Sequence, residues 1–160
     1  MPSDRMRLII DQPQSGVWNM AVDEALLDTA INQGIATLRF YQWAEPTLSL
    51  GYFQNYAERE SHTASLDCPC VRRHSGGGAI MHDRELTYSL ALPVERLGPG
   101  GAEGLYRLAH ASLISVLQTM LPAAAGSRLR LCETAITRPP ADEPFLCFLR
   151  RTDGDLLVQD

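Results

Sequence analysis

Only two segments of the chain have the apolar spacing of a long helix, and their irregular placement limits the folds that the sequence can adopt. Residues 18–31 and 105–121 carry apolar side chains at helical spacing, and Gly34 and Pro122 mark their ends. Strand-like segments lie on both sides of each helix, without the regular alternation of strand and helix that parallel α/β sheets require. The pattern therefore predicts an α+β fold, with a mixed, mostly antiparallel sheet packed with helices.

The predicted strands are short. In the clearest one, Glu85–Leu92, large apolar side chains occupy every second position, and Pro93 ends the pattern. The glycine-rich segment 97–104 is predicted to be a loop, as is Arg138–Pro140. The predicted strands cover residues 7–11, 38–43, 47–51, 85–92, 129–131, 145–149 and 155–158.

Length and composition exclude several classes of protein. The 160 residues suit one domain with a substantial core, which we expect to span residues 1–160. No apolar run approaches the roughly 18 residues of a membrane-spanning helix, and the N-terminus has no secretory signal. The net charge of −5 argues against general nucleic-acid binding. Four cysteines are too few and too irregular for a disulfide framework, so we expect a cytoplasmic protein with free thiols and no membrane or nucleic-acid partner.

Three consecutive glycines, Gly76–Gly78, form the most informative motif. Glycine allows positive φ and a close approach of the backbone to a ligand, and successive N–H groups can form a concave anion site. Arg72 and Arg73 precede the glycines and add charged donors suited to a carboxylate or phosphate, and the titratable ring of His82 follows. The motif therefore favours an anion site.

Simpler interpretations of the parts remain open. The glycines alone are typical of a hairpin turn, and an arginine pair alone is typical of a solvated face. No Lys-Ser or Lys-Thr follows the glycines, which excludes a P-loop, and the spacing of a Rossmann fingerprint is absent.

Residues 72–83 closely resemble the RRxxGGGAVxHD signature of the lipoate-protein ligase and octanoyltransferase family (biotin/lipoate protein ligases). Upstream, Asn19–Glu24 is similar to the family's NxAxDE helix motif, and residues 39–51 are similar to its RFYxW and PTxSxG strands. Leu86–Ser89 matches the strand after the HD pair. The resemblance covers most of residues 8–158 and implies a class II aminoacyl-tRNA synthetase/biotin-ligase-like fold. Biotin ligases themselves have a different, arginine-rich glycine loop.

The resemblance also implies which residues bind the acyl group. The glycine motif would surround the acyl carbonyl and, in ligases, the adenylate phosphate, while the first helix and a neighbouring strand would close the other side. The implied acyl and adenylate site comprises Arg73, Ser75, Gly76, Gly77, Gly78, Ile80, His82, Met20, Val22, Glu24 and Trp43. For Met20, Val22 and Trp43, plain core packing is an equal alternative, because an apolar acyl pocket is built from core-like residues.

Cys147 lies among apolar residues, with Arg150 and Arg151 just beyond it. A lone cysteine is most often a small buried hydrophobe, but nearby cationic groups favour the nucleophilic thiolate. The octanoyltransferase branch of the family works through an acyl-thioester and carries a cysteine in a similar setting, so the resemblance makes Cys147 the candidate nucleophile. Cys68 and Cys70 provide only two soft ligands, so we expect no metal site there.

The sequence contains no lysine, so all 14 basic residues are arginines. In the family, a GxKIxGSAQ segment carries a lysine that polarises the acyl carbonyl and the phosphate. This segment would follow residues 153–158, and the chain ends before it. We therefore expect either a piece of a longer protein or a shortened relative.

Together these features predict the transfer of an octanoyl or lipoyl group to a lysine of a lipoyl carrier domain. In one version, Cys147 attacks an octanoyl thioester on acyl carrier protein. In the other, ATP and Mg²⁺ activate free lipoate as an acyl-adenylate, and a cysteine is dispensable. A non-catalytic acyl-binding module is the third hypothesis. The resemblance implies lipoate or octanoate as substrate, no prosthetic group, and the lipoyl domains of 2-oxoacid dehydrogenases or the glycine cleavage H protein as acceptors.

Overall fold

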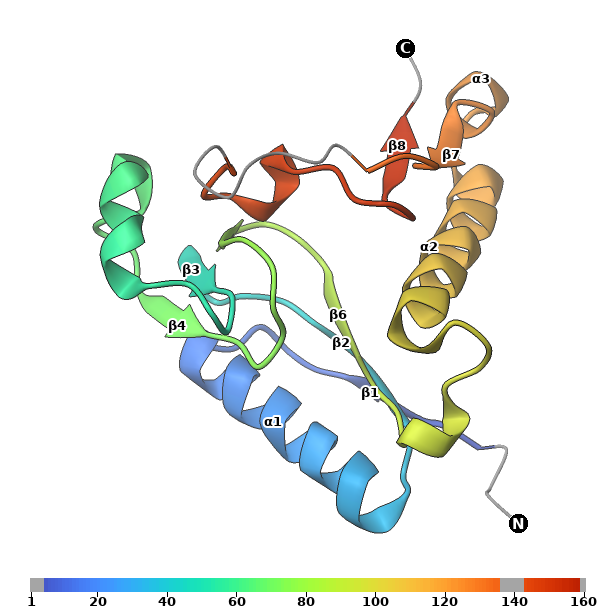
Figure 1. The fold of residues 1–160 in the computed structure, drawn as a ribbon, viewed down its shortest axis with the longest axis horizontal. Helices are drawn as coiled ribbons and strands as arrows, with labels where there is room; N and C mark the ends of the chain where they lie inside the picture. The colour runs from blue at the N-terminus through green and yellow to red at the C-terminus, as the bar shows by residue number, and fades with distance from the viewer. Residues whose placement is uncertain (1–4, 136–142, 159–160) are drawn as a thin grey trace. The chain divides into compact units, whose positions relative to one another are not determined.

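The computed structural model describes residues 5–135 and 143–158 (Figure 1). The chain divides into two compact units. The first comprises Met1–Val94 and Pro144–Leu149, and the second comprises Glu95–Glu143 and Arg150–Asp160. Within the described ranges, none of the helices has the length and apolarity that crossing a membrane requires.

The first unit contains a three-stranded sheet with the strand order β1-β2-β6. Strand β1 (Arg7–Ile10) runs parallel to β2 (Thr37–Tyr41), and β2 pairs antiparallel with β6 (Thr87–Ala91). Burial alternates along β2, so that every second side chain faces the interior. The sequence predicted all three strands, and the structure confirms them with slightly shorter bounds.

A second three-stranded sheet in the same unit has β3 at its centre. Strand β3 (Thr47–Leu50) is buried on both faces, and it pairs parallel with β4 (Cys70–Arg72) and antiparallel with β5 (Ile80–His82). The sequence predicted β3 but neither neighbour, because three residues are too few to show an alternating pattern. Both sheets mix parallel and antiparallel pairs, as the α+β prediction requires.

Helix α1 (Gly16–Gln33) covers the first sheet. It begins after Ser15, whose hydroxyl accepts a hydrogen bond from the Trp18 N–H, and ends at Gly34, whose φ of 67° suits a helix C-cap. Leu26 and Ala30 on its buried face pack together with Ala91 of β6. The predicted helix and its glycine end are therefore confirmed.

Short 3₁₀ turns complete the first unit. The turns η1 (Tyr56–Ser61), η2 (Thr63–Ser65) and η5 (Cys147–Leu149) belong to this unit, whereas η3 (Val94–Arg96) lies at the boundary where the second unit begins. The predicted strand over residues 145–149 is wrong. Among the described residues the backbone there pairs with Ala79 alone, and from Cys147 on the chain turns into η5, in which the Leu149 N–H donates to the Leu146 carbonyl (3.2 Å). A short apolar run does not by itself distinguish a strand from a buried turn.

The second unit contains α2 (Gly101–Met120), α3 (Ala123–Gly126) and an antiparallel pair, β7 (Leu129–Leu131) and β8 (Leu156–Val158). Both strands were predicted. Helix α2 begins at Gly101, before the predicted start at Leu105, so the expected loop over residues 101–104 is wrong. The predicted loop over Arg138–Pro140 lies outside the described residues.

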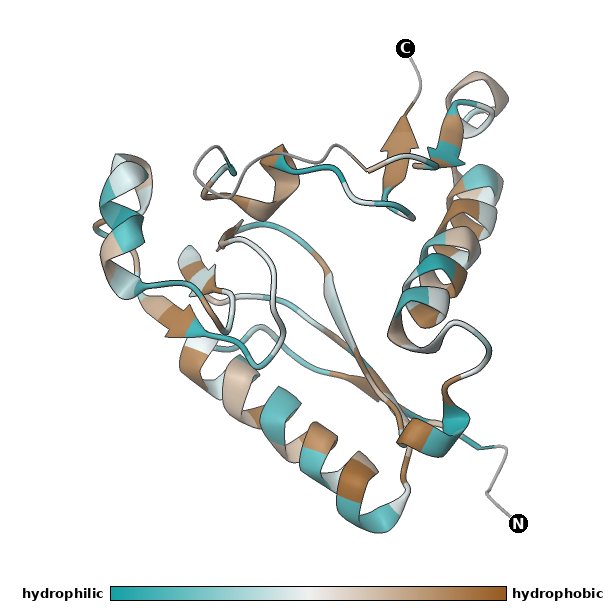
Figure 2. Ribbon diagram, viewed as in Figure 1, coloured by the Kyte–Doolittle hydropathy of each residue, from teal (hydrophilic) through white to brown (hydrophobic). Residues whose placement is uncertain are grey.

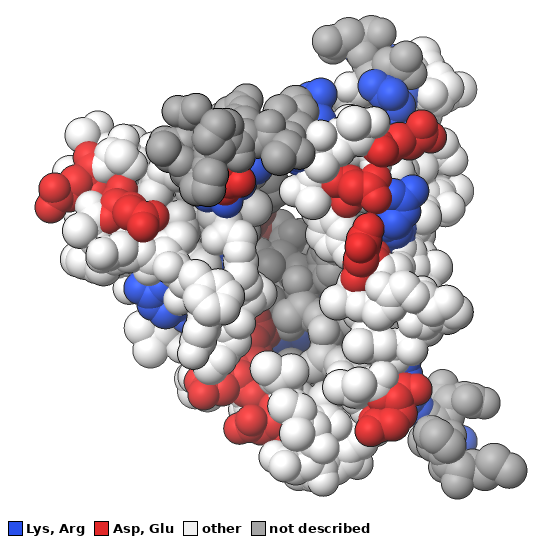
Figure 3. All heavy atoms as spheres, viewed as in Figure 1, with Lys and Arg blue, Asp and Glu red and all other residues white. Residues whose placement is uncertain are grey.

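The core of the second sheet positions the segment that carries Cys147. Leu48, Leu50 and Ala79 are buried together, and Phe145 and Leu146 pack against them. In Figure 2 the turn η5, which carries Cys147, is hydrophobic, whereas α1 and α2 show alternating hydrophobic and hydrophilic bands. On the face that Figure 3 shows, acidic and basic side chains are mixed, and the described residues form no continuous basic patch.

Candidate active site

The glycine motif lies in the loop that connects β4 to β5 across the end of β3. Because β3 lies between β4 and β5, this loop is not a hairpin turn. Two backbone hydrogen bonds hold the crossing in place, from the Arg73 N–H to the Leu50 carbonyl (3.0 Å) and from the Tyr52 N–H to the Ser75 carbonyl (2.9 Å). The hairpin interpretation of the glycines is therefore excluded.

The Arg73 guanidinium organises this loop. Its Nε–H donates to Ser75 Oγ (3.1 Å), and its Nη1 donates to both the carbonyl and the hydroxyl of Ser49 (3.1 Å each). Its Nη2 donates to the carbonyl oxygens of Gly76 (2.9 Å) and Gly78 (2.6 Å). A guanidinium has five N–H donors, so each of them has a protein acceptor here.

Arg73 is also a cation that pairs with no acidic side chain in the described part of the chain. None of the ion pairs among residues 5–135 and 143–158 involves it. Burial lowers the pKa of Arg73, and the neighbouring Cys147 and Tyr41 only partly offset this. The loop therefore holds a partly desolvated positive charge that favours negative charge developing nearby.

Arg72 performs a similar task for the segment after β3. Its Nη1 contacts the carbonyl oxygens of Gly51 (2.9 Å), Tyr52 (3.0 Å) and Gln54 (2.7 Å). Arg72 is exposed, and its Nη1 holds the segment after β3 in place.

The Gly77 N–H is available to a ligand. Because the C=O and N–H of a trans peptide point in opposite directions, the Gly76 carbonyl that faces Arg73 turns the Gly77 N–H away from it. Among the described residues, no acceptor is bonded to that N–H. Gly77 has a φ of 89°, a conformation that favours glycine. That backbone N–H groups of the motif face a ligand stays a prediction.

Cys147 lies next to Gly77. The Cys147 N–H donates to the Ala79 carbonyl (2.7 Å), and the Ala79 N–H donates to the Phe145 carbonyl (2.8 Å). These bonds place the Cys147 Sγ atom 3.7 Å from the position that a Cβ atom on Gly77 would occupy. The thiol is half-buried and free. The nearby guanidinium is that of Arg73, whereas Arg150 pairs with Glu143 within the second unit.

A cavity of about 430 Å³ adjoins the loop, between α1 and the strands β5 and β6. Its exposed lining is mostly apolar, as a site for an alkyl chain requires. Of the predicted site residues, Met20, Trp43, Arg73, Ser75, Ile80 and His82 line it. The sequence reasoning missed the other lining residues, which are Asp23, Leu27, Tyr41, Ser49, His74 and Thr87–Ala91.

His82 forms part of the cavity wall, and it is only 4% exposed. Its ring stacks on the Trp43 indole, with the ring centroids 3.8 Å apart. Its Nε2 atom lies 2.8 Å from Ser49 Oγ, and its Nδ1 atom lies 2.5 Å from Glu85 Oε1. Both ring nitrogens therefore have partners within the protein.

Glu85 joins His82 to Thr87 and Trp43. The Thr87 hydroxyl donates to Glu85 Oε1 (2.8 Å) and accepts from the Trp43 Nε1–H (2.9 Å). Burial raises the pKa of Glu85, but the hydrogen bonds from His82 and Thr87 and the charge of His82 outweigh it, so that the pKa is lowered. Glu85 is thus held as a carboxylate that accepts from both neighbours.

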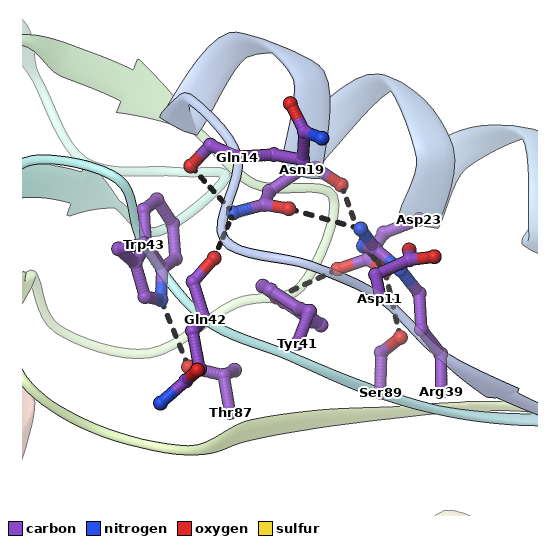
Figure 4. A network of polar contacts seen from close by, with 10 residues as sticks. All are labelled: Asp11, Gln14, Asn19, Asp23, Arg39, Tyr41, Gln42, Trp43, Thr87 and Ser89. Carbon is purple, nitrogen blue, oxygen red and sulfur yellow. Dashed lines mark hydrogen bonds and ion pairs between the residues drawn. The ribbon is translucent and has the colours of Figure 1, made fainter.

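A second polar network lies beside the cavity (Figure 4). Asp23 accepts hydrogen bonds from Ser89 Oγ (2.6 Å), the Tyr41 hydroxyl (2.9 Å) and Arg39 Nη1 (2.9 Å). Burial, together with the charge and hydrogen bond of Asp23, raises the pKa of Tyr41 far above its ordinary value, so the hydroxyl stays neutral.

Arg39 is the centre of that network, and it is completely buried. It forms ion pairs with Asp11 (2.7 Å) and Asp23 (2.9 Å), bonds to Asn19, and lies over the Tyr41 ring. Apart from Asp11, these residues belong to the NxAxDE and RFYxW motifs, so the motif match was a signal that could have identified them.

Six predicted site residues are not among those that line the cavity: Gly76, Gly77, Gly78, Cys147, Val22 and Glu24. The three glycines and Cys147 belong to the glycine loop and its neighbour described above, whereas Val22 and Glu24 lie on α1. Val22 packs against the buried cluster of Leu26, Ala30 and Ala91, which is the core-packing alternative. Glu24 is exposed and pairs with His74 (3.2 Å), and His74 itself lines the cavity. Their roles toward an acyl group stay predictions.

The structure brings together no metal site in the part of the chain that it describes. No group of three or more His, Cys, Asp or Glu side chains there could hold an ion. The four cysteines are free, Cys147 among them.

A family model and several curated proteins match this chain. The family model described as "Lipoyl protein ligase A/B catalytic domain" matches residues 15–133. A protein of Carboxydothermus hydrogenoformans named Octanoyltransferase LipM is 54% identical over 79 residues, which cover 48% of this chain and 29% of that protein. Its namesake from Kyrpidia tusciae is 40% identical over 120 residues, which cover 71% of this chain and 43% of that protein. The chain thus spans less than half the length of these relatives.

Solved structures share the fold. A lipoate-protein ligase A solved with bound ATP superimposes with a TM-score of 0.64 at 23% identity, over 81% of this chain and 51% of that one. The bi-partite lipoate protein ligase of Thermoplasma acidophilum, studied with its E2 lipoyl domain, gives a TM-score of 0.54 at 21% identity, over 82% and 49%. At these identities the likeness shows the fold alone, and it confirms the predicted α+β, ligase-like architecture.

Proposed function

The chain belongs to the family of the lipoyl protein ligase A/B catalytic domain, and on this premise we propose that it transfers an octanoyl group to a lysine of a lipoyl carrier domain. Cys147 is the nucleophile in this proposal, and residues 1–160 supply the catalytic domain or a part of it. The observation that carries the proposal is the position of the Cys147 thiol beside Gly77, at the loop that Arg73 organises.

The chemistry has two balanced steps. The Cys147 thiolate attacks the carbonyl carbon of an octanoyl thioester, a new C–S bond forms, and the carrier thiol leaves with a proton. The neutral lysine amine then attacks the acyl-enzyme, the C–S bond breaks as an amide forms, and the proton that the amine nitrogen loses goes to the Cys147 sulfur, which leaves as a thiol. Each step passes through a tetrahedral oxyanion, which the free Gly77 N–H and the Arg73 charge are placed to stabilise.

The cavity supplies the site for the alkyl chain. Its volume of about 430 Å³ lies within the usual range of ligand pockets. Arg73 and Ser75 form its end at the glycine loop, and Leu27, Leu90 and Ala91 provide apolar lining on α1 and β6. An acyl chain in this cavity would have its carbonyl at the glycine loop.

One observation favours the thioester route over the ATP-dependent ligase route. In the ligase route Arg73 would hold the phosphate of an acyl-adenylate, but all five of its N–H donors already have protein acceptors. Binding a phosphate would therefore break at least one of these bonds. The curated relatives are also named octanoyltransferases, whereas ATP is bound in a structure that shares only the fold. A non-catalytic acyl-binding module would not require a thiol at the loop.

The partners follow from the same chemistry. We propose octanoyl-acyl carrier protein as donor, and lipoyl domains of 2-oxoacid dehydrogenases or the glycine cleavage H protein as acceptors. The Thermoplasma ligase that shares this fold was studied with an E2 lipoyl domain. We place the reaction in the cytoplasm, where free cysteines remain reduced.

A transfer assay without ATP tests the proposal. The purified protein is mixed with octanoyl-acyl carrier protein and an isolated lipoyl domain, and the domain is analysed by intact mass. We expect octanoylation of the wild-type domain, none of a domain whose acceptor lysine is replaced by arginine, and none with Cys147→Ala. Transfer that requires ATP and survives Cys147→Ala would instead support the ligase route, and binding without transfer would support the module.

A further inference from the structure

We propose that Ser49 and His82 are positioning residues that act through Arg73 to hold the glycine loop against Cys147. The inference deepens the proposed function and rests on it. It assigns a task to a hydrogen-bonded chain of side chains that begins at Trp43 and ends at Arg73, in the wall of the cavity.

With a neutral His82 ring, the direction of every hydrogen bond in this series of side chains follows from what each group can do. Trp43 Nε1–H only donates, so the Thr87 hydroxyl accepts from it and donates to Glu85. The Glu85 carboxylate only accepts, so His82 carries a proton on Nδ1. In the neutral ring Nε2 is then unprotonated, and the Ser49 hydroxyl donates to it.

The contact between Ser49 and Arg73 also has only one possible direction. A guanidinium only donates, so Ser49 Oγ accepts from Arg73 Nη1 while its own proton is directed to His82. The Ser49 hydroxyl is completely buried in the central strand β3. His82 cannot turn away from it, because the ring is stacked on Trp43 and bonded to Glu85 on its other side. The orientation of Ser49 Oγ is therefore determined by its surroundings.

Ser49 in turn holds one side of the Arg73 guanidinium. Both bonds of Nη1 go to Ser49, one to the carbonyl and one to the hydroxyl. Because the guanidinium is planar and rigid, fixing Nη1 also fixes Nη2, which contacts the carbonyls of Gly76 and Gly78. These carbonyls flank Gly77, whose peptide lies against the Cys147 thiol.

Loss of the Ser49 hydroxyl should affect the rate of acyl-enzyme formation rather than the binding of the acyl donor. Loss of the Ser49 hydroxyl leaves Nη1 with one protein acceptor and allows the guanidinium to tilt, which shifts the Gly77 N–H relative to the reacting carbonyl. A displacement of about 1 Å at a reacting centre can cost on the order of a hundredfold in rate. The alkyl cavity itself is little changed, so we expect the saturating rate to fall while half-saturation by the acyl donor stays the same.

Single-turnover formation of the acyl-enzyme tests this inference. Ser49→Ala and His82→Phe are compared with the wild type, using octanoyl-acyl carrier protein as the probe; the phenyl ring preserves the stack on Trp43 but removes both nitrogens. We expect each variant to lower the saturating rate by roughly tenfold to a hundredfold, with unchanged half-saturation. Ser49→Thr keeps the hydroxyl and should restore most of the rate. Asp83→Asn, which removes an exposed charge beside His82, serves as the matched control and should behave like the wild type.

The double variant Ser49→Ala/His82→Phe separates a shared effect from two independent ones. If His82 acts through Ser49, the double variant is no slower than the slower single variant. If the rate reductions of the two single variants multiply in the double variant, His82 acts by another route, and the inference that it acts through Ser49 is overturned.

A spectroscopic measurement tests the hydrogen bonds from Glu85 through His82 to Ser49 without reference to activity. In ¹⁵N-histidine NMR spectra of the wild-type protein at neutral pH, we expect His82 as the Nδ1–H tautomer with an unprotonated, hydrogen-bonded Nε2. An Nε2–H tautomer would overturn the inference. Acyl-enzyme formation at equal rates in the wild type and Ser49→Ala would overturn it while leaving the proposed function intact. Absence of any acyl-enzyme in the wild type would overturn the proposed function and this inference with it.

Discussion

Gly51 and Gly77 approach each other backbone to backbone: a Cβ atom on Gly51 would lie 2.0 Å from the Gly77 carbonyl oxygen. Gly51 directly follows β3, and Gly77 belongs to the loop that crosses the end of that strand. Two segments that are well separated in the sequence thus meet at a point where no side chain fits. The position of the glycine loop beside Cys147 depends on this contact.

Replacement of Gly51 by alanine should therefore displace the glycine loop. The Cβ atom would overlap a backbone oxygen, which has no flexible side chain to move aside, so we expect a loss of roughly 1–3 kcal/mol in the free energy of unfolding. Acyl-enzyme formation should fall as well, because the loop carries the Gly77 N–H. Urea unfolding and single-turnover kinetics measure the two effects. Gly76→Ala is the matched control, since a Cβ there would meet nothing within 4 Å, and a Gly51→Ala protein as stable and active as this control would contradict the prediction.

Gly77→Ala should affect the reaction more than the fold. The residue has a φ of 89°, and a side chain there costs roughly 1–2 kcal/mol. Its Cβ would also lie 3.4 Å from Arg73 Nη2 and 3.7 Å from Cys147 Sγ. We expect the acyl-enzyme to form about a hundredfold more slowly, on the scale of one misplaced oxyanion donor. A variant with an unchanged rate of acylation would show that the Gly77 peptide takes no part.

The buried charge of Arg39 leads to a stability prediction. Arg39→Met keeps the length of the side chain but leaves Asp11 and Asp23 without their cation. Breaking a buried ion pair by removing one partner costs about 3–5 kcal/mol, and since both aspartates are partly exposed we expect the lower end of that range. Urea unfolding measures the loss. Glu24→Gln, next to Asp23 on α1, removes only an exposed partner of His74, so it should change the stability by less than about 0.5 kcal/mol. Equal losses in both variants would contradict the prediction.

The lowered pKa of Glu85 leads to a specific pH dependence of the free energy of unfolding. Its pKa is lowered in the folded protein, because the hydrogen bonds from His82 and Thr87 outweigh the effect of burial. A carboxylate of this kind stabilises the fold above its unfolded pKa of about 4.3, and the contribution is lost as the pH falls through the folded value. The wild type should therefore be more stable than Glu85→Gln above about pH 5, with a difference that shrinks on acidification. Urea unfolding at a series of pH values measures this difference. A constant difference between neutral and acidic pH would argue against the ionised Glu85.

Much of the fold could be predicted from the sequence because its longer elements have clear periodic patterns. Helix α1 follows from helical spacing and Gly34, and β6 follows from strict alternation before Pro93. Strands β4 and β5 could not be predicted, since each has three residues and is defined by its pairing with β3 rather than by its own pattern. The segment after Pro144 has an apolar run, which predicted a strand. In the structure this run packs against Leu48 and Leu50 and does not form the hydrogen bonds of a sheet.

The candidate site was predictable in membership more than in geometry. The glycine motif, Arg73, His82 and Cys147 were all identified, but the arginines were expected to grip an anion. In the structure their donors contact carbonyl oxygens of Gly51, Gly76 and Gly78. Those acceptors exist only once the loop has crossed β3, so no spacing rule could reveal them. Ser49 and Glu85 were missed for the same reason, since their importance comes from contacts with His82.

The position of the acyl group on the protein tests the central claim most directly. The wild-type protein is incubated with octanoyl-acyl carrier protein, digested at low pH, and its peptides are weighed. We predict one octanoyl group, removable by hydroxylamine, on the peptide that contains Cys147, with Cys68, Cys70 and Cys132 unmodified. Because the sequence contains no lysine, no stable lysine amide within these 160 residues can be mistaken for it. An unmodified Cys147, or an octanoyl group shared equally among the four cysteines, would contradict the claim that the glycine loop directs the acyl carbonyl to this thiol.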